Sequence, residues 1–105
     1  KAQTKKGDPP MSVVVVIDLI AKEGHLEPLI EQLRKILPDT RAYDGCLFLK
    51  MAVYEGKNVV ALYEEWETKG HQEAYVAWRM ENGHELIEPH IESFEATYAD
   101  VLSTY

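Results

Sequence analysis

The sequence predicts an α+β fold in which four strands and two helices follow one another in the order β-α-β-β-α-β. Three observations support this order. An apolar, β-branched run at 12–20 has the composition of a central strand. The segment 25–37 repeats its apolar residues with the period of an amphipathic helix. The segment 58–81 changes from residues typical of a pleated sheet to helix-like spacing.

The first helix is expected to lie between two prolines. Within 25–37, the apolar positions 26, 29, 30, 33, 36 and 37 fall on one face of a helix. Pro28 belongs to the first turn, where its missing N–H does little harm. Because proline cannot continue the hydrogen-bond ladder, Pro38 is expected to end the helix.

The second half of the chain predicts a hairpin, a helix and a last strand. Strands are expected at 46–55 and 58–67, with a short turn between them. Thr68 can cap a helix over 69–81. After a further turn or short helix, apolar residues alternate along 91–101, which indicates a fourth strand.

This order of elements is the ferredoxin-like split arrangement. The two helices would cover one face of the sheet and leave the other face exposed. Because an exposed apolar sheet face must find a partner, a homodimer is the expected assembly.

The charge of the chain argues against some classes of partner. The 105 residues carry a formal net charge of −7. Three lysines and one aspartate give the first ten residues +2, so the remaining residues carry −9. This acidity argues against nucleic-acid binding. The sequence also shows no basic amphipathic helix of the kind that binds a membrane surface. Residues 1–10 are interpreted as a flexible tail or a cloning remnant, and 11–105 as the domain.

Cysteine and histidine usage predicts neither a disulfide nor a metal ion. Cys46 is the single cysteine, which precludes a disulfide within the chain and favours a reducing cytoplasm. His84 and Glu88 stand four residues apart, with His90 near, a spacing that a metal site can use. Since no strict ligand motif accompanies them, no metal ion is expected.

The stretch LYEEWETKGHQEAYVAWR, residues 62–79, concentrates aromatic and ionisable side chains. On a strand, Leu62, Glu64 and Trp66 face one side, and the residues between them face the other. On the helix that follows, residues three or four positions apart share a face, which here contains His71, Ala74, Tyr75 and Trp78. If that face covers the sheet, the two sets of side chains meet.

Together these side chains suggest a site for a flat aromatic molecule. Trp66, Tyr75 and Trp78 could surround such a ligand. Arg79, next to the helix face, could hold an enolate or phenolate oxygen. The alternative interpretation is that the aromatic residues only fill the core and that Arg79 forms a surface salt bridge.

The same stretch offers two proton acceptors. Glu64 or His71 could take a proton from a substrate, since burial raises the pKa of a glutamate into a useful range. Alternatively, Glu64 is a strand-end carboxylate paired with a lysine or arginine, and His71 is a polar residue of the helix start. The predicted catalytic residues are Glu64, Trp66 and Arg79. The predicted substrate-pocket residues are His71, Tyr75 and Trp78.

Three motifs carry a resemblance to a known family: DGCL at 44–47, LYEEWE at 62–67 and EAYVAWR at 73–79. With them, residues 12–101 resemble the antibiotic biosynthesis monooxygenase family. The resemblance implies a dimeric α+β barrel with a pocket between sheet and helices in each subunit. Some members oxidise quinols or polyphenolic aromatics with molecular oxygen and without flavin, haem or metal. Others degrade haem, process small signalling molecules or have no assigned activity.

The chain also departs from the family's patterns. Many members place a histidine nine residues after the strand tryptophan, where this chain has Tyr75. A founding type that oxidises aromatics has an asparagine where this chain has Leu62. The haem-degrading relatives use an asparagine in the first strand and an axial histidine in the second helix. Because the first strand here reads VVVVIDL and the only helical histidine is at the helix start, haem degradation is disfavoured.

Three functions therefore compete. The leading expectation is a cytoplasmic, homodimeric oxidoreductase that oxidises a small aromatic or quinol-like substrate with O2 and without a cofactor. The second is a dimer that binds a small ligand, or is associated with stress, and has no catalysis. The third is an isomerase that acts on a small carbonyl compound through a base such as Glu64 or His71.

Overall fold

The computed structural model describes residues 11–105, and the tail expected at 1–10 lies outside them. Its strands are β1 (Val13–Ala21), β2 (Cys46–Val53), β3 (Val59–Trp66) and β4 (Ile91–Asp100). Its helices are α1 (Leu26–Ala42), α2 (Lys69–Met80), α3 (His84–Ile87) and the 3-10 turn η1 (Glu88–His90). The predicted β-α-β-β-α-β order is confirmed. Among residues 11–105, no helix combines the length and the apolar character needed to cross a membrane.

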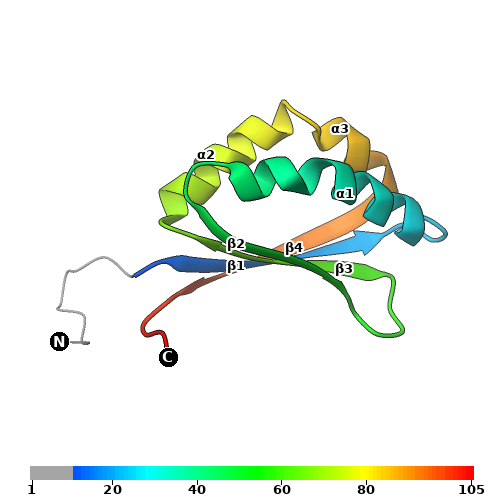
Figure 1. Ribbon diagram of the computed structural model, residues 1–105. Helices are drawn as coiled ribbons and strands as arrows, with labels where there is room; N and C mark the ends of the chain where they lie inside the picture. The colour runs from blue at the N-terminus through cyan, green and yellow to red at the C-terminus, as the bar shows by residue number, and fades with distance from the viewer. Residues whose placement is uncertain (1–10) are drawn as a thin grey trace.

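The four strands form one antiparallel sheet in the order β2-β3-β1-β4. The central strand β1 places Val15 between Glu64 of β3 and Tyr98 of β4. Figure 1 shows the helices gathered over one face of this sheet. Since side chains alternate along a strand, every second residue of β1 and β3 points into the layer between sheet and helices.

Helix α1 is longer than the sequence predicts. It continues to Ala42 with Pro38 inside it, so the prediction that Pro38 ends the helix is wrong. A proline in a helix interior costs about 3 kcal/mol, because it removes a hydrogen bond and crowds the preceding turn. The last turn offsets this cost by packing. Thr40 is fully buried there, and the carbonyl of Ile36 accepts a hydrogen bond from Arg79 of α2.

Two clusters of buried side chains fill the space between sheet and helices. The aliphatic cluster consists of Leu19, Ala21, Leu29, Leu33, Ile36, Val60, Leu62 and Ile87. The aromatic cluster consists of Val13, Val15, Cys46, Trp66 and Tyr75, with Ile17, Tyr43, Leu49 and Trp78 packed against it. Glu64 lies on β3 between Leu62 of the aliphatic cluster and Trp66 of the aromatic cluster.

No helix covers the opposite face of the sheet within residues 11–105 (Figure 1). The strand register places Val16 beside Tyr63, and Ile20 beside Val59, on this open face. Phe48 and Tyr63 remain 39% and 36% exposed there. The expectation that one sheet face is covered and the other open is therefore confirmed.

Candidate functional site

Glu64 is a buried carboxylate in the middle of the sheet. It lies on β3 opposite Val15 and Leu49, with its side chain on the face that the helices cover. The residue is 2% exposed. The indole N–H of Trp66, two residues along the same face, donates a hydrogen bond of 2.9 Å to Oε1 of Glu64.

The surroundings of Glu64 favour its protonated form. Burial raises the pKa of the Glu64 carboxyl, and the hydrogen bond from Trp66 opposes this effect only in part. Within residues 11–105, no lysine, arginine or histidine lies within ion-pair distance of Glu64. A buried carboxylate without a cationic partner holds a proton more readily than a solvated one, which suits a general base or acid.

Trp66 connects this carboxylate to a group of four aromatic rings. Trp66 is completely buried, and Tyr75 of α2 stacks on it at 5.2 Å between ring centroids. Tyr43, in the loop between α1 and β2, lies 5.4 Å from Tyr75 and 5.5 Å from Trp78. The rings therefore run from the buried Trp66 to the half-buried Tyr43 and Trp78.

Tyr43 is a member of this group that sequence reasoning missed. It follows the end of α1 and precedes the Asp44-Gly45 turn, so no helical or strand period includes it. Its ring makes an edge contact with Trp66 at 6.4 Å between centroids. Only the folded chain brings residue 43 to residue 66, and the one signal in the sequence is an aromatic residue next to the DGCL motif.

Arg79 forms a buried network that joins α2 to α1. Its Nε donates to the hydroxyl of Tyr75 at 2.9 Å, and its Nη2 donates to Oγ1 of Thr40 at 2.9 Å and to the carbonyl of Ile36 at 2.8 Å. Its Nη1 donates to the carbonyl of Asn82 at 2.8 Å. The hydroxyls of Thr40 and Tyr75 are 2.6 Å apart. Thr40 was not among the predicted site residues.

This network occupies most of the arginine's donors. A guanidinium group has five N–H donors, and protein oxygens take four of them here. That Arg79 holds a substrate oxygen stays a prediction, since these contacts give it a structural task as well. Burial raises the pKa of Tyr75, while its hydrogen bonds with Thr40 and Arg79 oppose the rise.

His71 lies at the start of α2, where it braces a turn. Its Nδ1 is 2.8 Å from Oγ1 of Thr68, the helix N-cap, and its Nε2 is 3.8 Å from Asp44. Gly45 adopts a φ of +92°, and a Cβ at that position would overlap the ring of His71. The glycine therefore allows the imidazole to lie directly on the turn that precedes β2.

The buried face of α2 differs from the predicted one by about one position. Its buried residues are Gln72, Tyr75 and Arg79, while Ala74 is exposed. The prediction that Ala74 belongs to the core face is therefore wrong. Arg79 can lie on the buried face because its guanidinium donates hydrogen bonds to Thr40 and to two carbonyl oxygens, which offset the cost of burying its charge. Helical spacing alone does not reveal these partners.

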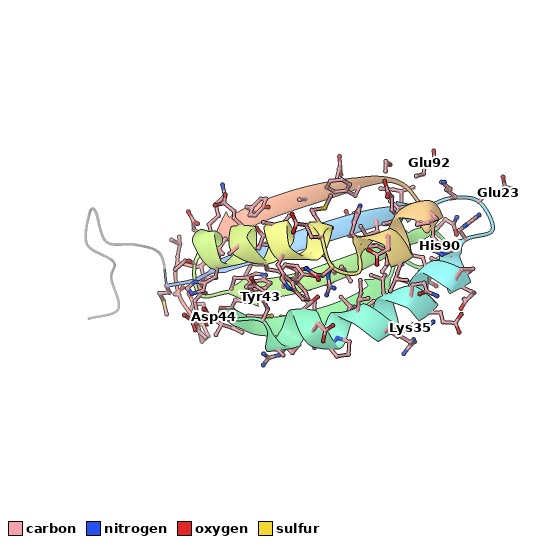
Figure 2. The ribbon with its side chains drawn as sticks, turned by 90° about the horizontal axis from the view of Figure 1, so that it is seen from above. Glu23, Lys35, Tyr43, Asp44, His90 and Glu92 are labelled. Atoms are coloured by element: carbon pink, nitrogen blue, oxygen red, sulfur yellow. The ribbon has the colours of Figure 1, made fainter. Side chains whose placement is uncertain are left out.

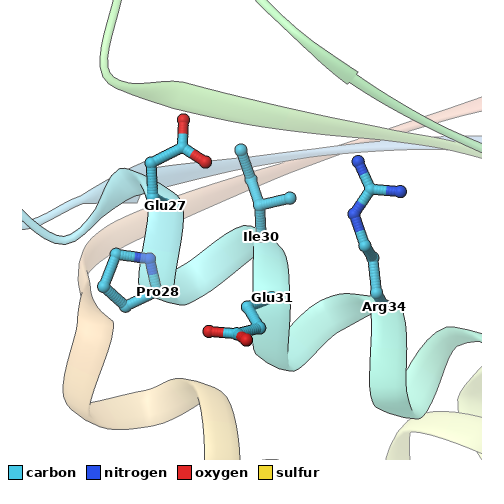
Figure 3. Close-up of a pocket in the computed structure, with 5 residues that line it drawn as sticks. All are labelled: Glu27, Pro28, Ile30, Glu31 and Arg34. Carbon is cyan, nitrogen blue, oxygen red and sulfur yellow. The ribbon is translucent and has the colours of Figure 1, made fainter.

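None of the six predicted site residues lines either of two hollows on the described surface. The first, of about 510 Å³, runs along the first turns of α1 (Figure 3). The residues around it are Glu27, Pro28, Ile30, Glu31 and Arg34. The second, of about 420 Å³, lies beside the start of β4. The residues around it are His84, Glu88, Ile91, Glu92, Ser93 and Phe94.

The histidine–carboxylate spacing at 84–88 does not assemble a three-ligand metal site. Nε2 of His84 lies 4.0 Å from Glu88. Within residues 11–105, no group of three histidine, cysteine or acidic side chains is close enough to hold one ion.

The fold and the site define a class of protein. It is a ferredoxin-like α+β domain that encloses an isolated carboxylate and an aromatic cluster between its sheet and its helices. The family model for antibiotic biosynthesis monooxygenase matches residues 12–87. The chain therefore belongs to the antibiotic biosynthesis monooxygenase family, and the resemblance noted in its motifs is confirmed.

Solved structures support the fold. A protein from Shewanella oneidensis is 23% identical, with a TM-score of 0.78 over 90% of this chain and 95% of that chain. An antibiotic biosynthesis monooxygenase is 17% identical, with a TM-score of 0.75 over 85% and 97%. A dimeric ferredoxin-like protein from an uncultured marine organism is 15% identical, with a TM-score of 0.70 over 90% and 91%. The curated proteins include no significant match.

Proposed function

We propose that this protein binds a small, electron-rich aromatic or quinol-like molecule and oxidises it with molecular oxygen, without a cofactor. The observation that carries the proposal is Glu64, a buried carboxylate with a raised pKa and an indole donor on one oxygen. Membership of the monooxygenase family supports the reaction class. The aromatic cluster supports the class of substrate, because flat rings bind well against other flat rings.

The protein's part in this reaction is proton transfer and exclusion of water. Glu64 takes a proton from the substrate, and Trp66 holds the carboxylate in place through its N–H. The substrate anion then gives one electron to O2, and the two radicals combine at the substrate carbon. The resulting peroxide anion takes back the proton that Glu64 holds and becomes a hydroperoxide. Loss of water from this hydroperoxide leaves a carbonyl, so one oxygen atom enters the product and the other leaves as water. The buried site shields the radicals from solvent.

The exposed end of the aromatic cluster is the proposed way in. Trp66 and Tyr75 are buried, whereas Tyr43 and Trp78 are half-buried and stand next to each other. A substrate that separates Tyr43 from Trp78 would reach Trp66 and then Glu64. In this proposal Tyr75 and Trp78 line the pocket and His71 supports the turn at its edge.

Arg79 has a proposed role in positioning. Its donors fix the hydroxyl of Tyr75 and the end of α1, so that Tyr75 stays stacked on Trp66. One N–H remains for a substrate oxygen, as the sequence suggested. Loss of this arginine would therefore change substrate binding through the pocket wall.

A homodimer in a reducing cytoplasm is the proposed setting. The open sheet face carries apolar side chains that a second copy would cover. A structural relative is described as a dimeric ferredoxin-like protein, which supports this assembly. The single free cysteine supports the compartment.

Oxygen uptake by the metal-stripped protein tests the proposal. The assay compares a panel of quinols and anthrone-like aromatics with the wild type, Glu64→Gln and Glu65→Gln. Glu65 is the matched control, because it neighbours Glu64 in sequence and faces the opposite side of the sheet. We expect Glu64→Gln to lower kcat at least about 100-fold, the usual contribution of a general base, and Glu65→Gln to leave it within about twofold.

The negative result is equally informative. A folded protein that binds an aromatic ligand and shows no oxygen uptake across the panel would overturn the oxidase proposal. It would favour either a non-catalytic ligand-binding or stress-associated dimer, or an isomerase. An isomerase would still lose turnover in Glu64→Gln, whereas a binding protein would show no turnover to lose.

A further inference from the structure

Two histidines meet at the end of the molecule away from the aromatic cluster. His25 precedes α1, and His90 ends η1, 65 residues later. Their Nδ1 atoms are 3.0 Å apart, and their ring centroids are 5.2 Å apart with an interplanar angle of 48°. Figure 2 shows His90 at the opposite end of the ribbon from Tyr43. The pair therefore lies outside the proposed oxidation site.

The backbone holds both histidines in place. The N–H of Lys22 donates to the carbonyl of His90 at 3.0 Å, which ties the two loops together. The N–H of His25 donates to the carbonyl of Lys22 at 2.9 Å, and the N–H of Leu29 donates to the carbonyl of His25 at 2.9 Å. Since the main chain on each side is fixed, little ordering would be needed for the two rings to bind one ion.

We propose that His25 and His90 form a two-histidine site for a divalent copper ion. A neutral imidazole carries one N–H and one lone pair, so an approach of 3.0 Å between Nδ1 atoms directs at least one lone pair at the other ring. When the donor ring carries its proton on Nε2 in place of Nδ1, both rings are neutral and a metal ion can take a lone pair from each Nδ1. Imidazole is a common copper ligand, and Cu²⁺ binds nitrogen sites most strongly among the divalent first-row metals.

The spacing of the two nitrogens is close to that of two ligands on one metal ion. With metal–nitrogen bonds of about 2.0–2.1 Å, two ligands at a right angle stand about 2.9 Å apart, and two tetrahedral ligands about 3.3 Å apart. The observed separation of 3.0 Å fits neighbouring positions of a square-planar ion. Each ring would turn about its Cβ–Cγ bond so that both lone pairs meet at the metal.

The local charge also favours a cation. Four glutamates each stand two residues from one of the histidines, namely Glu23, Glu27, Glu88 and Glu92. Figure 2 shows Glu23 and Glu92 at the same end of the molecule as His90. Lys22 is the one basic residue within three positions of either histidine. Because the four glutamates outnumber Lys22, the local charge is negative and attracts a divalent cation.

The coordination would be completed from outside the chain. No third histidine, cysteine or acidic side chain within residues 11–105 is close enough to form a three-ligand group. The ion would therefore keep open positions for water or for a small anionic ligand. This separates the proposed site from a closed structural one, which has four protein ligands.

Copper titration of the full chain tests the site. Binding of Cu²⁺ is measured by calorimetry for the wild type, His25→Ala, His90→Ala and the control His84→Ala. His84 is a matched control because it is a histidine of the same end of the chain, outside the pair. We expect one ion per chain, at least about tenfold weaker binding in each variant of the pair, and no change in the control, since each pair variant loses one of two metal bonds.

A spectroscopic measurement keeps the test decisive if a variant does not fold. The electron paramagnetic resonance spectrum of the wild type with one equivalent of Cu²⁺ should show two coordinated imidazole nitrogens. One nitrogen or none would overturn the site, as would equal weakening of binding in His84→Ala. This outcome is independent of the oxidation proposal, because oxygen uptake is measured on metal-stripped protein.

Discussion

The aliphatic and aromatic clusters fill the same layer between sheet and helices, but they differ in the polar groups buried beside them. The aliphatic cluster buries leucines, valines and isoleucines without a hydrogen-bonding side chain. Beside the aromatic cluster, the protein buries Glu64, Thr40 and Arg79 and supplies each with a partner. The difference teaches that one end of the core stabilises the fold by area alone. The other end also buries polar groups, and their hydrogen bonds offset the cost of desolvation.

The largest effect is expected in the aromatic cluster. Trp66→Ala should lower the free energy of unfolding by about 4 kcal/mol, because it empties a fully buried site and removes the donor to Glu64. Urea unfolding at fixed protein concentration measures the loss. Trp78→Ala is the control, and it should cost clearly less since Trp78 is only half-buried. Equal losses of unfolding free energy in the two variants would contradict the expectation that Trp66, and not Trp78, is the buried centre of the cluster.

A slightly smaller effect is expected in the aliphatic cluster. Leu33 is 1% exposed, and Leu33→Ala should lower the free energy of unfolding by about 3 kcal/mol through the cavity it leaves. Because no ionisable group belongs to this cluster, kcat in the uptake assay should stay unchanged at temperatures where the variant is folded. A large fall in kcat would show that the two clusters are coupled.

The polar network should contribute less than either cluster. Thr40→Val keeps the shape of the side chain and leaves Arg79 and Tyr75 without their hydroxyl partner. We expect a loss of about 2 kcal/mol, the usual cost of an unpaired buried polar group. Thr40→Ser retains the hydroxyl and should cost less. If both variants lose the same stability, the methyl group matters more than the hydrogen bonds.

The last prediction concerns how the free energy of unfolding changes with pH. Burial raises the pKa of Glu64 in the folded chain above its unfolded value, so the folded state binds more protons between the two values. Stability should therefore fall as the pH rises from the unfolded pKa through the folded pKa, and then level off. Glu64→Gln should flatten this fall, and Glu65→Gln should not. Unfolding free energies from pH 4 to pH 8 measure the slopes, and identical slopes in all three proteins would contradict the assignment.

The order of elements could be predicted from the sequence because it depends on local patterns. The alternation in 58–67 and the apolar spacing in 25–37 identified a strand and a helix that the fold contains. The end of α1 could not be predicted, since the packing of Thr40 against α2 outweighs the local effect of Pro38.

The candidate site was only partly predictable. Glu64 and Trp66 were placed on the correct face because strand alternation is strict. Tyr43 and Thr40 were missed because they join the site through contacts more than 20 residues apart in sequence. Arg79 was placed next to the buried face and not at its centre, because an arginine enters a core only where distant oxygens receive its donors.

The contact between Gly45 and His71 has a consequence for motion. The imidazole lies where a Cβ of residue 45 would be, so the turn before β2 and the first turn of α2 interlock. Displacement of the turn at Gly45 would therefore also displace the first turn of α2, because the imidazole packs directly on it. A methyl group at position 45 would force the turn before β2 and the first turn of α2 apart.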